Sequence, residues 1–154
     1  MGIVHPPTTK KKIIFFTEGA ITPEQIAKSI SKHREKKNIG AHEIFLGQVR
    51  ADVIDGNTVS SIEYSAYREM AENELEKIRE NIIQKHKLTC AHVVHSLGKV
   101  YAGEISLFVF VSSPHRNAAM DACREMIELI KKDVPVFGKE IFQNDEYRWK
   151  ENRK

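Results

Sequence analysis

A cluster of cationic side chains around one predicted helix is the part of this sequence best suited to chemistry. His115 and Arg116 follow a Ser-Ser-Pro turn at the start of that helix, and Lys131 lies at its end. We expect Ser113 to cap the helix and Pro114 to take its first position, which puts His115 and Arg116 in the first turn. The helix dipole disfavours cations there, so the pair either binds an anion or points into solvent.

Lys131 is unusual because it continues an apolar row. Ala119, Cys123 and Ile127 recur every four residues in a helix predicted over residues 117–132, and Lys131 is the next member of this row. The ammonium group of a lysine in this register can lie in either of two environments. Its ammonium either extends into solvent or is partly desolvated, which lowers its pKa and suits it to acid–base or nucleophilic chemistry.

Arg50 is a further candidate, at the end of a strand predicted over residues 41–50. An arginine where a strand opens into a polar loop can clamp a phosphate or carboxylate, or can be an ordinary surface residue. Gly47, inside the same strand, predicts a bulge or a close approach by another group.

Two helices and a hairpin are expected before residue 87. Thr22, Pro23 and Gln25 form a capping box that begins a helix reaching about residue 37. The strand 41–50 is expected to form a hairpin with residues 58–65 through an Asp55-Gly56 turn. A long amphipathic helix follows over residues 67–86, with four apolar residues facing inward: Met70, Leu75, Ile78 and Ile82.

The second half of the chain adds two strands, 88–96 and 99–112, which we expect to be joined by a Leu97-Gly98 turn. After the helix that carries Lys131, residues 134–142 form an extended segment. Strands in consecutive hairpins with helices inserted between them predict an α+β fold with a mainly antiparallel sheet. His92 and His95 lie three apart, hence on opposite faces of a strand, so no metal site is expected between them.

Composition narrows the class of protein. The 154 residues suffice for one domain, expected over residues 13–154 behind a flexible arm at 1–12. With 24 basic and 21 acidic residues the formal charge is only +3, which does not suit a dedicated nucleic-acid binder. Cys90 and Cys123 lack CxxC spacing, so neither a disulfide framework nor a zinc site is predicted. We expect a cytoplasmic protein that does not enter the membrane.

The distance along the helix predicts a dimer. His115 and Lys131 are separated by about fifteen residues, or about 22 Å at the rise of an α-helix. One small ligand cannot touch both ends of the helix in one chain. If both ends serve one site, the second end comes from another copy, as in an isologous homodimer.

Five segments resemble the large, catalytic subunit of molybdopterin synthase, in the order expected for that family and over about residues 15–153. The segments are Phe45-Leu-Gly-Gln-Val-Arg50, Ile62-Glu-Tyr-Ser-Ala-Tyr-Arg-Glu-Met-Ala71, Ser113-Pro-His-Arg116 with Ala118 and Ala122, Lys131-Lys-Asp-Val-Pro-Val-Phe-Gly-Lys-Glu140, and Arg148-Trp149.

The resemblance implies a fold and a reaction. The fold is the α/β hammerhead of that family, and the reaction adds two sulfurs to cyclic pyranopterin monophosphate, which forms the dithiolene of molybdopterin. Sulfur arrives as a thiocarboxylate on the C-terminal Gly-Gly of a small ubiquitin-like subunit, and two of each subunit form a heterotetramer. No cofactor or metal is implied. A supplied sulfur nucleophile also explains why neither cysteine needs to be reactive.

The resemblance also assigns roles. Lys131 matches an essential lysine, for proton transfer or for stabilising an acyl intermediate. Arg50, His115 and Arg116 match anion-binding residues, the last two from the second copy, and Arg153 matches a C-terminal arginine.

In two places this chain departs from the family pattern. Gly138 stands where the family has a second active-site lysine, and His95-Ser96 stands where it has His-Arg. Lys139 either replaces the missing lysine through a local shift of the strand or points to the opposite face.

Two other functions fit some of these observations. A non-catalytic module that binds the small subunit or a phosphorylated pterin is compatible with Gly138. A small RNA-binding protein using the Lys-rich arm and the Arg148-Trp149 end is compatible with the basic termini, but not with the mixed charge elsewhere.

Overall fold

The computed structural model describes residues 13–151, so the expected arm at 1–12 and the candidate Arg153 lie outside the described residues. Within residues 13–151, three helices and eight strands form an α+β fold, as the sequence predicts. In chain order they are β1 Phe16–Glu18, α1 Pro23–Lys32, β2 Ala41–Gln48, β3 Val53–Ile54, β4 Asn57–Ala66, α2 Arg68–His86, β5 Cys90–Tyr101, β6 Ile105–Ser113, α3 Arg116–Asp133, β7 Val136–Phe142 and β8 Tyr147–Trp149.

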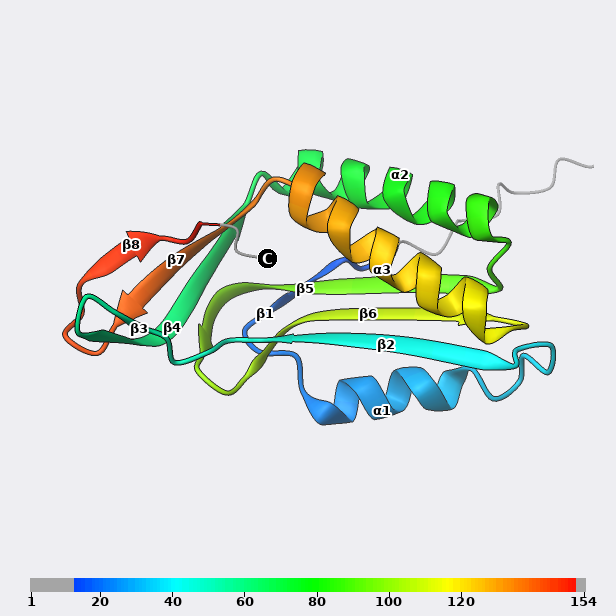
Figure 1. Ribbon diagram of the computed structural model, residues 1–154, viewed down its shortest axis with the longest axis horizontal. Helices are drawn as coiled ribbons and strands as arrows, with labels where there is room; N and C mark the ends of the chain where they lie inside the picture. The colour runs from blue at the N-terminus through cyan, green and yellow to red at the C-terminus, as the bar shows by residue number, and fades with distance from the viewer. Residues whose placement is uncertain (1–12, 152–154) are drawn as a thin grey trace, which may run out of the picture.

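The strands build one sheet in the order β2-β6-β5-β4-β7-β8, with β1 added beside β5 and β3 beside β4. Every pairing except that of β1 with β5 is antiparallel. Helices α2 and α3 cover one face of the β2-β6-β5 half and α1 lies on the other, while β4, β7 and β8 extend away as a second half (Figure 1). None of the helices within residues 13–151 is long and apolar enough to cross a bilayer.

The main core lies between the sheet and the helices α2 and α3. Alternate residues of β5 and β6, such as Val93 and Val109, meet Leu75 of α2 and Met126 of α3, and all four are at most 2% exposed. Burying such a side chain contributes about 1.5–3 kcal/mol. The alternation places the intervening residues of β5 and β6, including Phe108 and Phe110, on the face toward α1.

The sheet bends where β5 changes partners. Residues 90–95 of β5 pair with β6, whereas residues 98–101 pair with β4. Gly98 lies at this change with φ +80°, a conformation that a side chain disfavours, and a Cβ there would lie 3.0 Å from the Glu18 carboxylate. The expected Leu97-Gly98 turn is therefore wrong: β5 continues to Tyr101 and the chain turns at Gly103, where φ is +92°.

The expected hairpin between residues 41–50 and 58–65 is also wrong, because β2 pairs with β6 instead. The Asp55-Gly56 turn does form, but it joins β4 to the two-residue strand β3. Within β2, the ladder shifts register between Gly47 and Gln48, so the predicted irregularity at Gly47 is confirmed.

Three expectations about the helices need correction. The Thr22 capping box of α1 is confirmed, but the helix ends at Lys32 instead of about residue 37. The residues that follow form tight turns. In α2, Met70 is 63% exposed and Ala71 takes the inward position. The N-cap of α3 is His115 rather than Ser113, and Arg116 rather than Pro114 takes the first helical position. The reason is that β6 continues through Ser113, whose carbonyl accepts from Gly40 N–H at 3.0 Å.

Candidate functional site

A cavity of about 250 Å³ opens where the end of α3 meets the bend between the two sheet halves. Its polar lining consists of Tyr64 from β4, His95 from β5, Lys131 from α3 and Lys150 just after β8. Gly138 of β7 completes one wall, and apolar residues from the end of α3 and from β7 complete the rest. The cavity thus collects side chains from five separate segments of the chain.

Lys131 reaches this cavity from the last turn of α3, where the apolar row of the helix ends. The residue as a whole stays exposed, but burial of its ammonium lowers the pKa of Lys131, and the neighbouring Lys150 ammonium lowers it further. Both outcomes expected for this lysine are therefore combined, since the side chain reaches water through the mouth of the cavity. A lysine of lowered pKa is suited to proton transfer near neutral pH.

Lys150 stands beside the glycine that replaces the expected lysine. Its backbone N–H donates to the Gly138 carbonyl at 2.7 Å, and its Cβ lies 3.6 Å from where a Gly138 Cβ would be. That Cβ would also lie 3.1 Å from Ile62 Cγ2, so a side chain at position 138 needs its neighbours to shift. The candidate Arg153 lies outside the described residues, whereas Lys150 of the same C-terminal segment does line this cavity.

His95 forms the floor of the cavity and is 6% exposed. Its Nδ1 lies 2.7 Å from the Ser96 carbonyl, and its ring meets the edge of the Tyr64 ring at a centroid distance of 4.9 Å. Burial, joined by the charges of Lys131 and Lys150, lowers the pKa of His95 to about 4 against the opposing Ser96 hydrogen bond. The ring is therefore neutral at pH 7, with Nδ1–H donating to Ser96.

Tyr64 is also neutral in this cavity. Burial raises the pKa of Tyr64, against the lowering effect of its hydrogen bond, and the hydroxyl donates to Ser106 Oγ at 3.2 Å. The residue spacing did not point to a role for either residue, although Tyr64 lies in one of the family-like segments and His95-Ser96 stands where the family has His-Arg. The signal that could have found them is their position on strands that flank the bend at Gly98.

Lys139 does not line this cavity. Consecutive strand residues face opposite sides, and the Lys139 ammonium lies over the Tyr147 ring, 4.3 Å from its centroid. Of the two alternatives left open for this residue, β7 adopts the one in which Lys139 points away from Gly138. Arg148 is paired with Glu140 in the ladder and therefore faces the other side, that of Gly138, where it contacts Glu140 at 3.5 Å.

The remaining candidates lie apart from the cavity. His115 at the N-cap of α3 and Arg116 at its first position are exposed, and Lys131 lies in the last turn of the same helix. The Arg50 side chain is 70% exposed and contacts Asp52 at 3.4 Å. None of these three lines the Lys131 cavity.

An exposed aromatic surface adjoins the cavity. Tyr67 and Phe137 meet edge to face at a centroid distance of 5.4 Å, and Trp149 lies beside them along a shallow groove. Phe137 and Trp149 also line the cavity itself, so the groove and the cavity are direct neighbours. Exposed aromatic patches of this kind mark sites of contact with another molecule.

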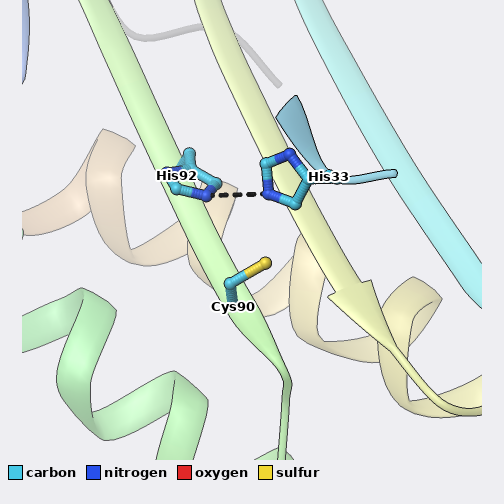
Figure 2. A group of neighbouring side chains, drawn as sticks. All are labelled: His33, Cys90 and His92. Atoms are coloured by element: carbon cyan, nitrogen blue, oxygen red, sulfur yellow. Dashed lines mark hydrogen bonds between the residues drawn. The ribbon is translucent and has the colours of Figure 1, made fainter. Parts of the chain in front are cut away.

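The cysteines and one histidine pair lie elsewhere. Burial, and to a lesser extent Glu43, raises the pKa of Cys123 to about 11, so its thiol is a poor nucleophile. Cys90 and His92 face α1, where they meet His33 (Figure 2). Burial, followed by the charges of His33, Arg79 and Lys36, lowers the pKa of His92 to about 4.

Comparison with known proteins shows which family the chain resembles. Residues 16–133 match the family model described as MoaE protein. Relatives called molybdopterin synthase catalytic subunit include that of Bos taurus, 35% identical over 93% of this chain and 73% of the relative. The relative from Thermoplasma volcanium is 35% identical over 86% of this chain and 93% of its own length. The chain spans 56% of the Rattus norvegicus relative, at 40% identity over 74% of this chain.

Solved structures agree. The molybdopterin synthase structure from Staphylococcus aureus superposes with a TM-score of 0.78 at 32% identity, covering 93% of this chain and all of that one. A complex of subunits 1 and 2 of molybdopterin-converting factor from Helicobacter pylori gives a TM-score of 0.77. The sequence identity is 22% over 93% of both chains, so it is the TM-score that establishes the shared fold.

Proposed function

Since this chain belongs to the MoaE family of molybdopterin synthase catalytic subunits, we propose that its sulfur transfer takes place in the Lys131 cavity. Its function is sulfur transfer in molybdenum cofactor biosynthesis. The observation that carries the placement is the pair of lysines, Lys131 and Lys150, in one cavity with neutral His95 and Tyr64. Two ammonium groups near each other favour an anionic substrate.

The substrates fit this charge. From the family resemblance we take them to be cyclic pyranopterin monophosphate and the thiocarboxylated C-terminus of a small ubiquitin-like subunit, both of them anions. The thiocarboxylate sulfur is the nucleophile and forms a bond to a carbon of the pterin, and the bond from that carbon to oxygen breaks, so that the oxygen leaves as water or as the freed oxygen of the phosphate. Water then cleaves the acyl–sulfur bond, which leaves sulfur on the pterin and a carboxylate on the tail. The buried Cys123 has no part in these steps.

Lys131 is the residue to which we assign proton transfer. Its lowered pKa makes the neutral amine more accessible than in an ordinary lysine, so it can accept a proton from the attacking water or return one to the pterin. In its protonated form the same group stabilises the negative charge that develops on the acyl oxygen.

Lys150 is the residue to which we assign the role of the lysine expected at Gly138. Support comes from its place in the cavity wall and from its backbone hydrogen bond to Gly138. Lys139 is the weaker candidate because its ammonium lies against Tyr147. Two cations in the cavity neutralise substrate charge better than one.

The aromatic groove beside the cavity is our proposed docking surface for the small subunit. A C-terminal tail that ends in Gly-Gly is narrow enough to follow the groove past Tyr67 and Trp149 into the cavity. The Helicobacter pylori relative is itself a complex of two subunits, which supports such a partner. Because both described cysteines are free thiols, we place the reaction in the reducing cytoplasm.

His115 and Arg116 belong in this proposal to the second copy of a homodimer within a heterotetramer. They are exposed at the far end of α3, and equivalent helices that meet antiparallel would bring them toward the partner's cavity, with Arg50 as a further anion-binding residue. Sedimentation of the isolated chain tests this arrangement. A monomer at micromolar concentration contradicts it.

The deciding experiment is single-turnover conversion of the pterin precursor with thiocarboxylated small subunit. Lys131→Ala is expected to abolish product while leaving the complex intact. Lys132→Ala is the matched control, because Lys132 is the next residue of α3, is exposed and does not line the cavity. Equal rates for both variants would remove Lys131 from the reaction. A wild-type chain that binds the small subunit without forming product would support the non-catalytic module.

A further inference from the structure

Three potential metal ligands meet on the face of the sheet opposite the Lys131 cavity. Cys90 and His92 lie two residues apart on β5, so both side chains point toward α1, and His33 enters from the end of that helix (Figure 2). One ligand atom of each residue lies within 4.8 Å of the other two. His33 and Cys90 are buried and His92 is half-buried.

The orientation of His33 is that of a ligand held in place. Its Nδ1 lies 2.7 Å from the carbonyl of Ser29, which requires Nδ1 to carry the proton and to donate it. The other nitrogen, Nε2, points to His92 Nε2 at 3.0 Å (Figure 2). Histidines that bind metals typically donate the second ring N–H to a backbone carbonyl or carboxylate in this way.

We propose that His33, Cys90 and His92 form a zinc site that joins the end of α1 to β5. Imidazole nitrogens and a cysteine sulfur are ligands that zinc prefers, at about 2.0–2.1 Å and about 2.3 Å. Tetrahedral geometry at those lengths separates two nitrogens by about 3.3 Å. The two Nε2 atoms, 3.0 Å apart, therefore need only a small shift to share one ion. Binding replaces the His–His hydrogen bond and releases the thiol proton of Cys90.

A path to the site and a place for a fourth ligand are both present. His33 and His92 border a cavity of about 610 Å³ between α1 and the sheet, which opens to solvent. A water molecule or small anion there would complete four-coordination. Lys28, Lys32 and Lys36 line the same cavity and oppose an added cation, so the negative charge of the Cys90 thiolate is needed to offset them.

The expected consequence is structural. Within α1 itself no residue is buried, and Ile30 is 41% exposed, so the apolar contact that holds this helix to the sheet is small. A metal that ties His33 to two residues of β5 fixes the end of the helix directly. Zinc should therefore raise the melting temperature and slow proteolysis between α1 and β2, in proportion to its binding.

The test measures zinc and cobalt binding to the untagged full-length chain. We expect one zinc per chain by equilibrium dialysis and metal analysis, and with Co²⁺ the near-ultraviolet absorption of a thiolate–cobalt bond. Cys90→Ala should abolish that absorption, and His33→Gln and His92→Gln should each weaken zinc binding at least tenfold. Circular dichroism checks that each variant is folded. The cobalt spectrum of the wild type tests for a thiolate ligand even if a variant does not fold.

Two matched controls keep the result specific. Cys123→Ala removes the other buried cysteine, and His86→Gln removes a histidine that pairs with Glu125 of α3, on the face of the sheet opposite α1. Both should bind zinc and cobalt as the wild type does. Absence of stoichiometric zinc binding, a cobalt spectrum without thiolate absorption, or zinc binding unchanged in Cys90→Ala would each overturn the proposal. None of these outcomes depends on the sulfur-transfer activity.

Discussion

The backbone N–H of Lys150 donates to the carbonyl of Gly138 at 2.7 Å, which places a lysine beside the one residue of β7 that has no side chain. The segment after β8 thereby provides a cation where the strand itself cannot. In the cavity, the Lys150 ammonium lies close enough to Lys131 to lower its pKa.

Replacing Lys150 should therefore impair the reaction, whereas replacing Lys139 should not. We expect Lys150→Ala to slow single-turnover product formation on the order of 10²-fold, the usual effect of removing one electrostatic contact to the transition state. Lys139→Ala should stay within about twofold of wild type, since that ammonium lies over Tyr147 outside the cavity. The reverse order of effects would restore Lys139 as the second lysine.

The pH dependence of the rate should identify the form of Lys131 that reacts. Burial and Lys150 lower its pKa, so the neutral amine becomes populated at a lower pH than in an ordinary lysine. The single-turnover rate should rise with pH through this pKa. In Lys150→Gln the repulsion is lost, the pKa of Lys131 rises, and the midpoint should move to higher pH. An unmoved midpoint would show that another group controls the rate.

Acid should destabilise the fold through His95. Its folded pKa of about 4 lies below the ordinary value of 6.5, so its contribution to stability is complete above pH 6.5 and is lost as pH falls toward 4. The loss is at most about 3 kcal/mol. Urea unfolding from pH 7 to pH 4 should show a smaller loss for His95→Gln. His115→Gln is the control, because its ring is exposed in the folded chain, and it should leave the acid sensitivity unchanged.

The two faces of α2 should differ sharply in their tolerance of substitution. Leu75 is 1% exposed in the main core, so Leu75→Ala should lower the free energy of unfolding by about 2–5 kcal/mol. Met70→Ala should change it by less than about 0.5 kcal/mol, because its side chain is largely in solvent. Denaturant unfolding measures both. A large loss for Met70→Ala would mean that α2 is rotated from its described position.

The aromatic groove should carry much of the affinity for the small subunit. We expect Tyr67→Ala to weaken that complex at least tenfold, since exposed aromatic residues near the centre of an interface dominate its energy. Tyr101→Ala is a matched control, as Tyr101 is 56% exposed at the end of β5 and lies outside the groove. Titration calorimetry compares the two. Equal affinities would move the docking surface elsewhere.

Local sequence patterns predict the helices and strands of this fold well, but they predict poorly which strands pair in the sheet. The capping box at Thr22 and the apolar periodicity of α3 are local signals, so both helices are predicted near their observed positions. The pairing of β2 with β6 joins residues about 65 apart in sequence, and no spacing within either strand encodes it. Turn chemistry at Asp55-Gly56 fixes a hairpin but not which strand completes it.

The same limit applies to the site. Lys131 is predictable because a lysine in an apolar helical row is locally anomalous. Lys150 and His95 have no such local mark, since both become neighbours of Lys131 only when β8 returns along β7 and β5 bends. Cys90 and His92, two residues apart on a strand, are a local signal. Their third companion, His33, depends on where α1 ends.

The bend of the sheet at Gly98 controls the distance between the two lysines of the cavity. Lys131 belongs to α3, which packs on the β2-β6-β5 half of the sheet, and Lys150 is hydrogen-bonded to Gly138 of β7 in the other half. Figure 1 shows these helices and strands. The spacing of the two charges is therefore set by the angle between the halves, which a single glycine with φ +80° helps to define. A substitution at Gly98 that changes this angle would therefore alter the reactivity of Lys131, although Gly98 does not line the cavity.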